Sequence, residues 1–232
     1  PCRKSGAFSA KDHFAKVFMR KTPSGVSPPH RSHLYKPFIT HIMTQIYMQP
    51  SMVDKLAPHP LEDYSGHRPV TGAEEIRRSR RAIHLLVVHC SATRNCDDYT
   101  PEQLIRDHVR RGFRGCGYHY YITKDGMIYA MRPVDLVGAH VQGHNRHSIG
   151  ICYEGGLDHK YMPADTRTPM QRQSLSQLIH RLLELHPNAY VVGHRDLSRD
   201  RNGDGVITPD EWIKLCPCFD AKLYNREWVV AP

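Results

Sequence analysis

Two histidines and one cysteine in this chain have the residue types and the positions of a metal site. His89 ends one apolar, β-rich run over residues 83–88, and His194 ends another over residues 189–193. A histidine after such a run is held at the rim of a sheet, where a metal ion and a substrate both reach it. Cys216 adds a soft thiolate. Two imidazoles and one thiolate form a three-ligand zinc set that leaves the fourth tetrahedral position for water, and such open sites are typical of hydrolases.

The segments around these residues are expected to alternate between strands and helices. Strands are expected over residues 83–88, 118–123, 127–131, 148–153 and 190–192. The sequence Thr-Pro-x-Gln occurs twice, at 100–103 and 168–171, and combines an N-cap, a proline at the first helical position and a capping box. We therefore expect an α/β fold in which a central mixed β-sheet is flanked by helices.

Four segments carry a family resemblance. They are His89-Cys90-Ser91-Ala92-Thr93, Gly117-Tyr118-His119-Tyr120-Tyr121-Ile122, Val192-Gly193-His194-Arg195-Asp196 and Lys214-Leu215-Cys216-Pro217-Cys218-Phe219-Asp220. In this order and spacing, they resemble the zinc-dependent N-acetylmuramoyl-L-alanine amidases of the phage-lysozyme and peptidoglycan-recognition type. The resemblance runs from about Arg80 to Phe219. It implies that His89, His194 and Cys216 bind zinc and that Tyr118 and Lys214 are catalytic.

The function implied by this resemblance is that of a peptidoglycan hydrolase of the endolysin kind. It would cut the amide between N-acetylmuramic acid and the L-alanine of the stem peptide, with zinc as cofactor. The alternative is a non-catalytic peptidoglycan-recognition module on the same fold. Binding-only relatives typically lack the cysteine ligand, so Cys216 favours the enzyme.

Three neighbours of these residues need an interpretation of their own. His119 alternates with Tyr118 along a strand, so only one of them faces the site. The resemblance places Tyr118 there, and His119 is then structural. Cys218 lies two residues after Cys216, but only Cys216 stands two positions after the lysine, as the family pattern requires. Asp196 is either an orienting partner of a ligand or a turn residue.

Substrate contacts are expected in the loop before the strand over residues 148–153, because the family carries substrate-contacting residues in this region. His140 and Asn145 are our candidates. Glu154 is a third, since related amidases place a carboxylate near this point. Cys152 occupies one of the positions where that carboxylate would stand.

Residues 200–211 fit the twelve-residue calcium-loop pattern. Side-chain oxygens fall at loop positions 1, 3, 5 and 9, glycine at 6 and glutamate at 12. The expected calcium ligands are Asp200, Asn202, Asp204, the Val206 carbonyl and Glu211. A second interpretation is compatible with the first, namely a capping box that spans residues 208–211.

The charge is uneven along the chain and suggests two parts. Residues 1–79 hold 12 Lys and Arg against 6 Asp and Glu, whereas residues 80–232 hold 20 against 17. We expect 1–79 to be a basic, proline-interrupted extension or linker and 80–232 to be the zinc amidase domain. Residues 5–30 faintly resemble the last helix-turn-helix of AraC-type regulators, but no second such unit is visible. A remnant without function is therefore preferred over DNA binding.

The remaining bulk features concern the compartment and the assembly. No run approaches the roughly 20 apolar residues of a membrane span, and no secretory signal is visible. Seven cysteines without regular spacing favour reduced, cytoplasmic synthesis. Action on the cell wall would then follow release of the phage or prophage type, and we expect a monomer.

Overall fold

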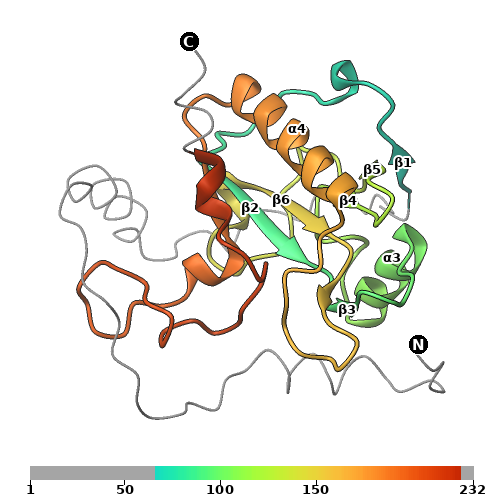
Figure 1. Ribbon diagram of the computed structural model, residues 1–232. Coiled ribbons are helices and arrows are strands. Elements are labelled where there is room, and N and C mark those ends of the chain that lie inside the picture. Colours follow the sequence, from blue (N-terminus) through green and yellow to red (C-terminus); the bar gives the residue numbers. More distant parts are fainter. Residues whose placement is uncertain (1–65, 226–232) are drawn as a thin grey trace.

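The protein is described here by a computed structural model that covers residues 66–225, so the helix-turn-helix resemblance at 5–30 lies outside the described residues. Its centre is a six-stranded sheet with the order β1-β5-β4-β6-β2-β8 (Figure 1). The strands are Arg68–Pro69 (β1), Leu85–Cys90 (β2), Tyr120–Ile122 (β4), Ile128–Ala130 (β5), Ser148–Tyr153 (β6) and Tyr190–Gly193 (β8). β2 is parallel to β6 and β8, and β4 is parallel to β6, whereas β5 is antiparallel to both β4 and β1. The expected mixed sheet is confirmed.

Two α-helices begin where the repeated Thr-Pro-x-Gln sequence predicts. They are Pro101–Arg110 (α3) and Pro169–Leu185 (α4), and both N-caps form complete capping boxes. Gln171 does more than close its box, since its Nε2 donates to the carbonyls of Ile122 and Glu154 at 3.1 and 2.9 Å. The first turn of α4 is thereby fixed to the ends of β4 and β6.

The shorter elements lie in the connections. A two-stranded parallel sheet and four 3₁₀ segments are described, namely Thr93–Arg94 (β3) with Gly156–Leu157 (β7), and Ala73–Glu75 (η1), Asn145–His147 (η2), His194–Leu197 (η3) and Ala221–Leu223 (η4).

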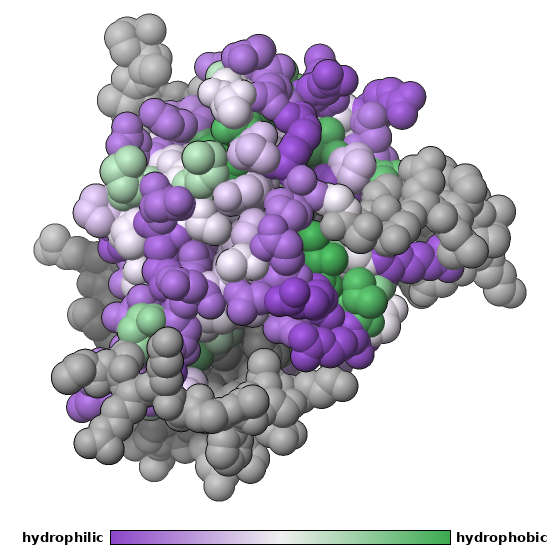
Figure 2. Space-filling view, turned by 90° about the vertical axis from the view of Figure 1, so that its right-hand side faces the viewer, coloured by the Kyte–Doolittle hydropathy of each residue, from purple (hydrophilic) through white to green (hydrophobic). Residues whose placement is uncertain are grey.

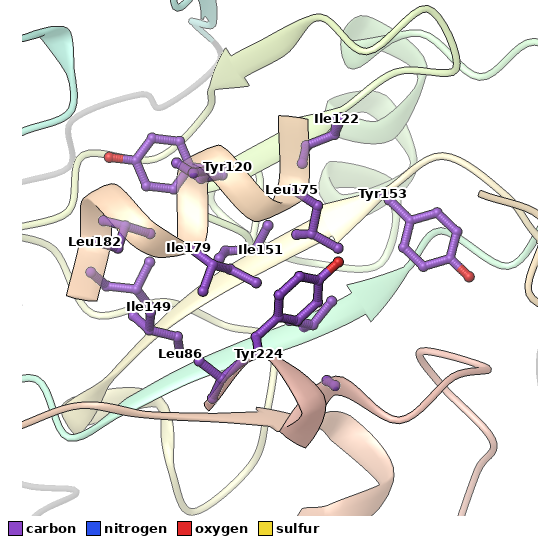
Figure 3. Close-up of a cluster of buried hydrophobic side chains, with 14 of the residues drawn as sticks. Leu86, Tyr120, Ile122, Ile149, Ile151, Tyr153, Leu175, Ile179, Leu182 and Tyr224 are labelled. Carbon is purple, nitrogen blue, oxygen red and sulfur yellow. The ribbon is translucent and has the colours of Figure 1, made fainter. Parts of the chain in front are cut away.

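The main core lies between α4 and one face of the sheet. Leu175, Ile179 and Leu182 of the helix pack against side chains of β2 and β6 such as Leu86 and Ile151 (Figure 3). Each of these side chains is fully buried. Burial of a Leu or Ile side chain contributes about 1.5–3 kcal/mol, so this layer holds α4 firmly on the sheet.

The alternation of side chains along β2 decides where the first histidine points. Leu86 and Val88 belong to the core under α4, whereas Leu85 and Val87 belong to a separate cluster on the other face. Successive side chains in a strand point to opposite faces. His89 therefore lies on the face away from α4.

The folded unit begins earlier than the predicted boundary at residues 79 and 80. β1 pairs with β5, and the Val70 amide donates to the Ile128 carbonyl at 2.8 Å. Ile76 is buried in the main core, and Arg181 Nε donates to the Ala73 carbonyl at 3.3 Å. Residues 66–79 therefore belong to the same folded unit as the sheet, and that part of the predicted division was wrong.

The surface is largely hydrophilic on the face shown in Figure 2, where apolar residues form small groups. Within residues 66–225, no helix combines the length and apolar character that a bilayer crossing requires.

Candidate active site

The two histidines come together because their strands are parallel neighbours. His89 is the fifth residue of β2, and His194 follows β8 directly. Val88 lies opposite Gly193 in the β2–β8 register, so both histidines emerge at the same edge of the sheet. Their Nδ1 atoms are 2.9 Å apart.

Cys216 joins the histidines from a loop more than 20 residues after β8. Its Sγ lies 3.9 Å from His89 Nδ1, and the three potential ligand atoms all lie within 4.8 Å of one another. Two hydrogen bonds hold the backbone of this loop in place. The Arg195 amide donates to the Cys216 carbonyl at 2.9 Å, and the Tyr153 hydroxyl donates to the Pro217 carbonyl at 2.7 Å.

All three side chains are buried, and burial is the main cause of the pKa shifts of the two histidines. Desolvation lowers the pKa of His194 to about 3 and lowers the pKa of His89 well below its usual range. Burial alone would raise the pKa of Cys216, but hydrogen bonds from Cys90 and the charge of Lys214 lower it. Neutral imidazoles and a thiolate are the states that bind a metal ion.

The donor set fits zinc by its chemistry and by its spacing. Nitrogen and sulfur are the usual zinc ligands, at about 2.0–2.1 and 2.3 Å, so that ligand atoms around one ion lie roughly 3–4 Å apart. The separations of 2.9 and 3.9 Å measured from His89 Nδ1 agree with this. Within the described part of the chain, the group that could hold a metal contains three residues, as an open site requires.

Cys218 points away from this group. Its thiol donates to the Gly156 carbonyl at 3.4 Å, on the small sheet.

Asp196 accepts from the Gly193 amide at 2.8 Å and pairs with Lys222 at 3.2 Å, so it holds the turn that leads into His194. Between the two interpretations left open for Asp196, the geometry favours the turn residue.

His89, His194 and Cys216, called the ligand group from here on, line a groove of about 430 Å³. Tyr118 and Lys214 also line this groove. The Tyr118 ring lies 5.0 Å from the His89 ring, centroid to centroid. Burial raises the pKa of Tyr118 well above its usual range, so its hydroxyl keeps its proton. Burial lowers the pKa of Lys214, with the Cys216 thiolate acting in the opposite direction. The groove thus combines a hydroxyl donor and an amine beside the ligand group.

His119 lies outside the groove, as expected of a structural residue. The ring is fully buried, Nδ1 accepts from the Gly150 amide at 2.9 Å, and Nε2 lies 3.0 Å from the Leu136 carbonyl. Burial lowers the pKa of His119 to about 3.

The three predicted substrate contacts have different positions. His140 and Asn145 line the groove, but both use polar atoms internally. Asn145 Oδ1 accepts from the amides of His140 and Val141, each at 2.9 Å. Glu154 does not line this groove, and its carboxylate accepts from the amides of Tyr99 and Lys124 at 2.7 and 2.9 Å. A substrate-contacting Glu154 is therefore not supported, because its oxygens anchor two loops.

Arg111 and Phe113 also line the groove, although the sequence did not single them out. They follow the end of α3, and the Arg111 guanidinium lies 5.1 Å from the centre of the Phe113 ring. No motif marks them, because packing alone brings the end of α3 to the edge where β2 and β8 terminate.

Residues 200–211 form a loop whose carboxylates cap its own backbone. Asp200 accepts from the amides of Gly203 and Gly205 at 2.6 and 2.8 Å. Glu211 accepts from the Arg201 and Thr208 amides at 2.7 and 3.0 Å, so the local capping interaction is present. Calcium binding by this loop stays a prediction.

Comparison with known proteins agrees with this geometry. Residues 79–205 match the family described as N-acetylmuramoyl-L-alanine amidase. An uncharacterised Haemophilus influenzae protein is 52% identical over 96 residues, which are 41% of this chain and 83% of that protein. The endolysin of Enterobacteria phage K11 is 35% identical over 147 residues, or 63% of this chain and 88% of the endolysin.

Among solved structures, the endolysin N-acetylmuramoyl-L-alanine amidase LysCS from Clostridium intestinale has a similar fold. The TM-score is 0.50 at 27% identity, and the alignment covers 67% of this chain and 90% of the other. The family match spans more than half of the sequence and includes the first two candidate ligands, His89 and His194. This chain belongs to the N-acetylmuramoyl-L-alanine amidase family.

Proposed function

We propose that this chain hydrolyses peptidoglycan at the amide between N-acetylmuramic acid and the L-alanine of the stem peptide. The observation that carries the proposal is the convergence of His89, His194 and Cys216 beside Tyr118 and Lys214 in one groove. The phage endolysin and the amidase LysCS support the same chemistry. Peptidoglycan is then the partner, and the cell wall is the place of action.

His89, His194 and Cys216 would hold zinc through two Nδ1 atoms and one Sγ. When bound, zinc supplies an activated water as the nucleophile and polarises the scissile carbonyl. The buried, neutral imidazoles favour binding, because no proton competes for their lone pairs near neutral pH.

Tyr118 and Lys214 would act on the charge that develops in the transition state. Attack on an amide carbonyl places negative charge on its oxygen, and a positioned donor stabilises that oxyanion. The protonated hydroxyl of Tyr118 donates a hydrogen bond, and the Lys214 ammonium supplies a positive charge. Because burial lowers the pKa of Lys214, its amine also exchanges a proton more readily than an exposed lysine.

A binding-only role is the alternative on the same fold. Recognition of a peptide needs no thiolate that is buried and aimed at two imidazoles. The placement of Cys216 therefore favours the enzyme.

The test is mass analysis of peptidoglycan digested by the full chain. We expect stem peptides with a free L-alanine amino group and glycan strands that keep the lactyl carboxyl group. A chelator should abolish these products, and added zinc should restore them. New reducing sugar ends, cleavage within the stem peptide, or binding without any product would contradict the proposal.

A further inference from the structure

A chain of hydrogen bonds leads from His89 into the interior of the protein. His89 Nε2, on the side of the ring away from the ligand group, lies 3.0 Å from His140 Nδ1. His140 Nε2 lies 3.3 Å from Ser148 Oγ, which donates to the His144 carbonyl at 2.8 Å. His89, His140 and Ser148 are all buried, with exposed fractions of 1%, 8% and 0%.

The direction of this chain follows from its last acceptor. A carbonyl oxygen only accepts, so the Ser148 hydroxyl proton points to His144. The hydroxyl oxygen is then free to accept from His140, which places the proton of that ring on Nε2. The neutral His140 ring accepts at Nδ1, and the proton of His89 must therefore be on Nε2. This leaves His89 Nδ1 unprotonated, and Nδ1 is the atom that faces His194 and Cys216.

We infer that His140 and Ser148 are positioning residues that hold His89 in the tautomer and orientation needed to bind the metal ion. The inference rests on the zinc site of the proposed function. A hydrogen bond to the second nitrogen of a metal-binding histidine is a general means of orienting the ring and raising its basicity. Here the partner is a second histidine, which is itself directed by a serine.

The space that the His140 ring occupies exists because Gly138 and Gly150 have no side chains. A Cβ atom at Gly150 would lie 2.6 Å from both Cγ and Cδ2 of His140, and one at Gly138 would lie 2.5 Å from Cδ2. Neither contact could be relieved without moving the imidazole. Gly150 belongs to β6, next to β2 in the sheet, so the absence of two side chains lets the His140 ring lie against the strand beside His89.

This arrangement also explains why His140 lines the groove without serving the substrate through its ring nitrogens. Both nitrogens are already engaged, one with His89 and the other with Ser148. Its backbone amide is held by Asn145 Oδ1 at 2.9 Å. The predicted pair of substrate contacts, His140 and Asn145, thus becomes one positioning ring and the side chain that supports its backbone.

The first experiment measures zinc affinity of the full chain by competition with a chromophoric chelator. His140→Leu removes both hydrogen bonds and should weaken zinc binding about 10–100-fold, the usual cost of losing such a partner. His140→Gln retains an acceptor and a donor on one planar group, so it should restore most of the affinity. Ser148→Ala removes only the far end of the chain and should give an intermediate loss.

The matched control is His186→Leu. His186 is also buried, its Nε2 accepts from the Ser79 amide at 3.3 Å, and it does not line the groove. This variant should lose stability, as judged by urea unfolding, while zinc affinity stays that of the wild type. An equal loss of zinc affinity in His186→Leu and His140→Leu would show a general effect of destabilisation and would overturn the inference.

The second experiment reads the tautomers directly from long-range nitrogen–proton NMR spectra of the full chain with labelled histidines. His89 and His140 should both carry their proton on Nε2, with His140→Gln assigning the His140 signals. In Ser148→Ala the His140 signals should shift. A proton on Nδ1 of His140 would refute the chain of donors, whatever the activity.

These measurements separate this inference from the proposed function. Wild-type zinc affinity in His140→Leu, together with cleavage of peptidoglycan, would remove the role of His140 and leave the function standing. If zinc bound tightly and its affinity depended on His140, but the wild type cleaved no amide, the role of His140 would stand and the proposed function would be wrong. If the wild type bound no zinc, the metal assignment beneath both would be wrong.

Discussion

At the scale of the residue, the site depends on which way a few side chains point. Cys216 and Cys218 are both thiols of the same loop, but only Cys216 reaches the two imidazoles, and Cys218 bonds to the Gly156 carbonyl. Two residues of chain thus separate a candidate ligand from a structural thiol. The difference gives a matched pair of variants.

Replacing Cys216 by Ser should abolish zinc binding and activity, because a serine hydroxyl is a poor ligand for zinc beside two imidazoles. Cys218→Ser should keep both, since its hydroxyl can still donate to the Gly156 carbonyl. Metal content and amide cleavage are measured on both purified proteins. If metal content followed Cys218 instead, the ligand assignment would be wrong.

Lys214→Ala should lower turnover about 10²-fold or more with zinc retained, which is the scale of losing one oxyanion donor. The reason is that the lysine lies beside the ligand group without belonging to it. Lys160→Ala changes an exposed lysine on another loop and serves as the control, with turnover unchanged. Near-normal turnover in Lys214→Ala would refute the catalytic role.

At the scale of the element, parallel pairing does most of the positioning. β2 lies between β6 and β8, so the edge where His89 and His194 emerge has a strand on each side of His89. The loop over residues 200–211 then separates His194 from Cys216 along the chain. The conformation of that loop therefore determines where the Cys216 thiolate lies relative to the two histidines.

Calcium should bind to this loop and raise the melting temperature of the zinc-loaded protein. Loops of this pattern bind with Kd values of about 10⁻⁴–10⁻³ M when used outside the cytosol. Calorimetry at millimolar calcium measures the heat of binding, and Asp204→Asn, which removes one charge and keeps an oxygen, should weaken it. Without any heat or change in melting temperature, the loop would be a capped turn alone.

Taken as a whole, the described residues form a six-stranded sheet with α4 on one face and the groove at one edge, together with the small sheet of β3 and β7. Residues 66–79 add β1 and a core side chain, Ile76, to this unit. The basic character of residues 1–79 is therefore shared between a part of the fold and the segment before it.

A chain starting at Gly66 should fold and cleave peptidoglycan like the full protein. A chain starting at Arg80 should be less stable, because β5 loses its partner strand and Ile76 leaves the core. Removing a buried Ile alone typically costs about 2–5 kcal/mol. Urea unfolding and product analysis of the two truncated proteins decide the matter. Equal stability of both would show that residues 66–79 contribute little.

Five of the six strands of the main sheet, the starts of both α-helices and the types of the candidate ligands could be predicted from the amino-acid sequence, whereas β1, β3 and β7 could not. Thr100 and Thr168 mark N-caps through local hydrogen bonds, and local interactions are readable from neighbouring residues. His89 and His194 stood out because each ends an apolar run. The family resemblance then selected Cys216, Tyr118 and Lys214.

The contacts of His140, Ser148 and Glu154 could be seen only in the folded structure. Glu154 directly follows an expected strand and His140 lies in the loop before that strand. Nothing in the local sequence distinguishes a carboxylate that binds two loop amides from one that faces a groove. His140 meets His89 across 51 positions of the chain, through a seat left open by Gly138 and Gly150. Contacts of this kind depend on strand order and side-chain packing, which only the folded sheet defines.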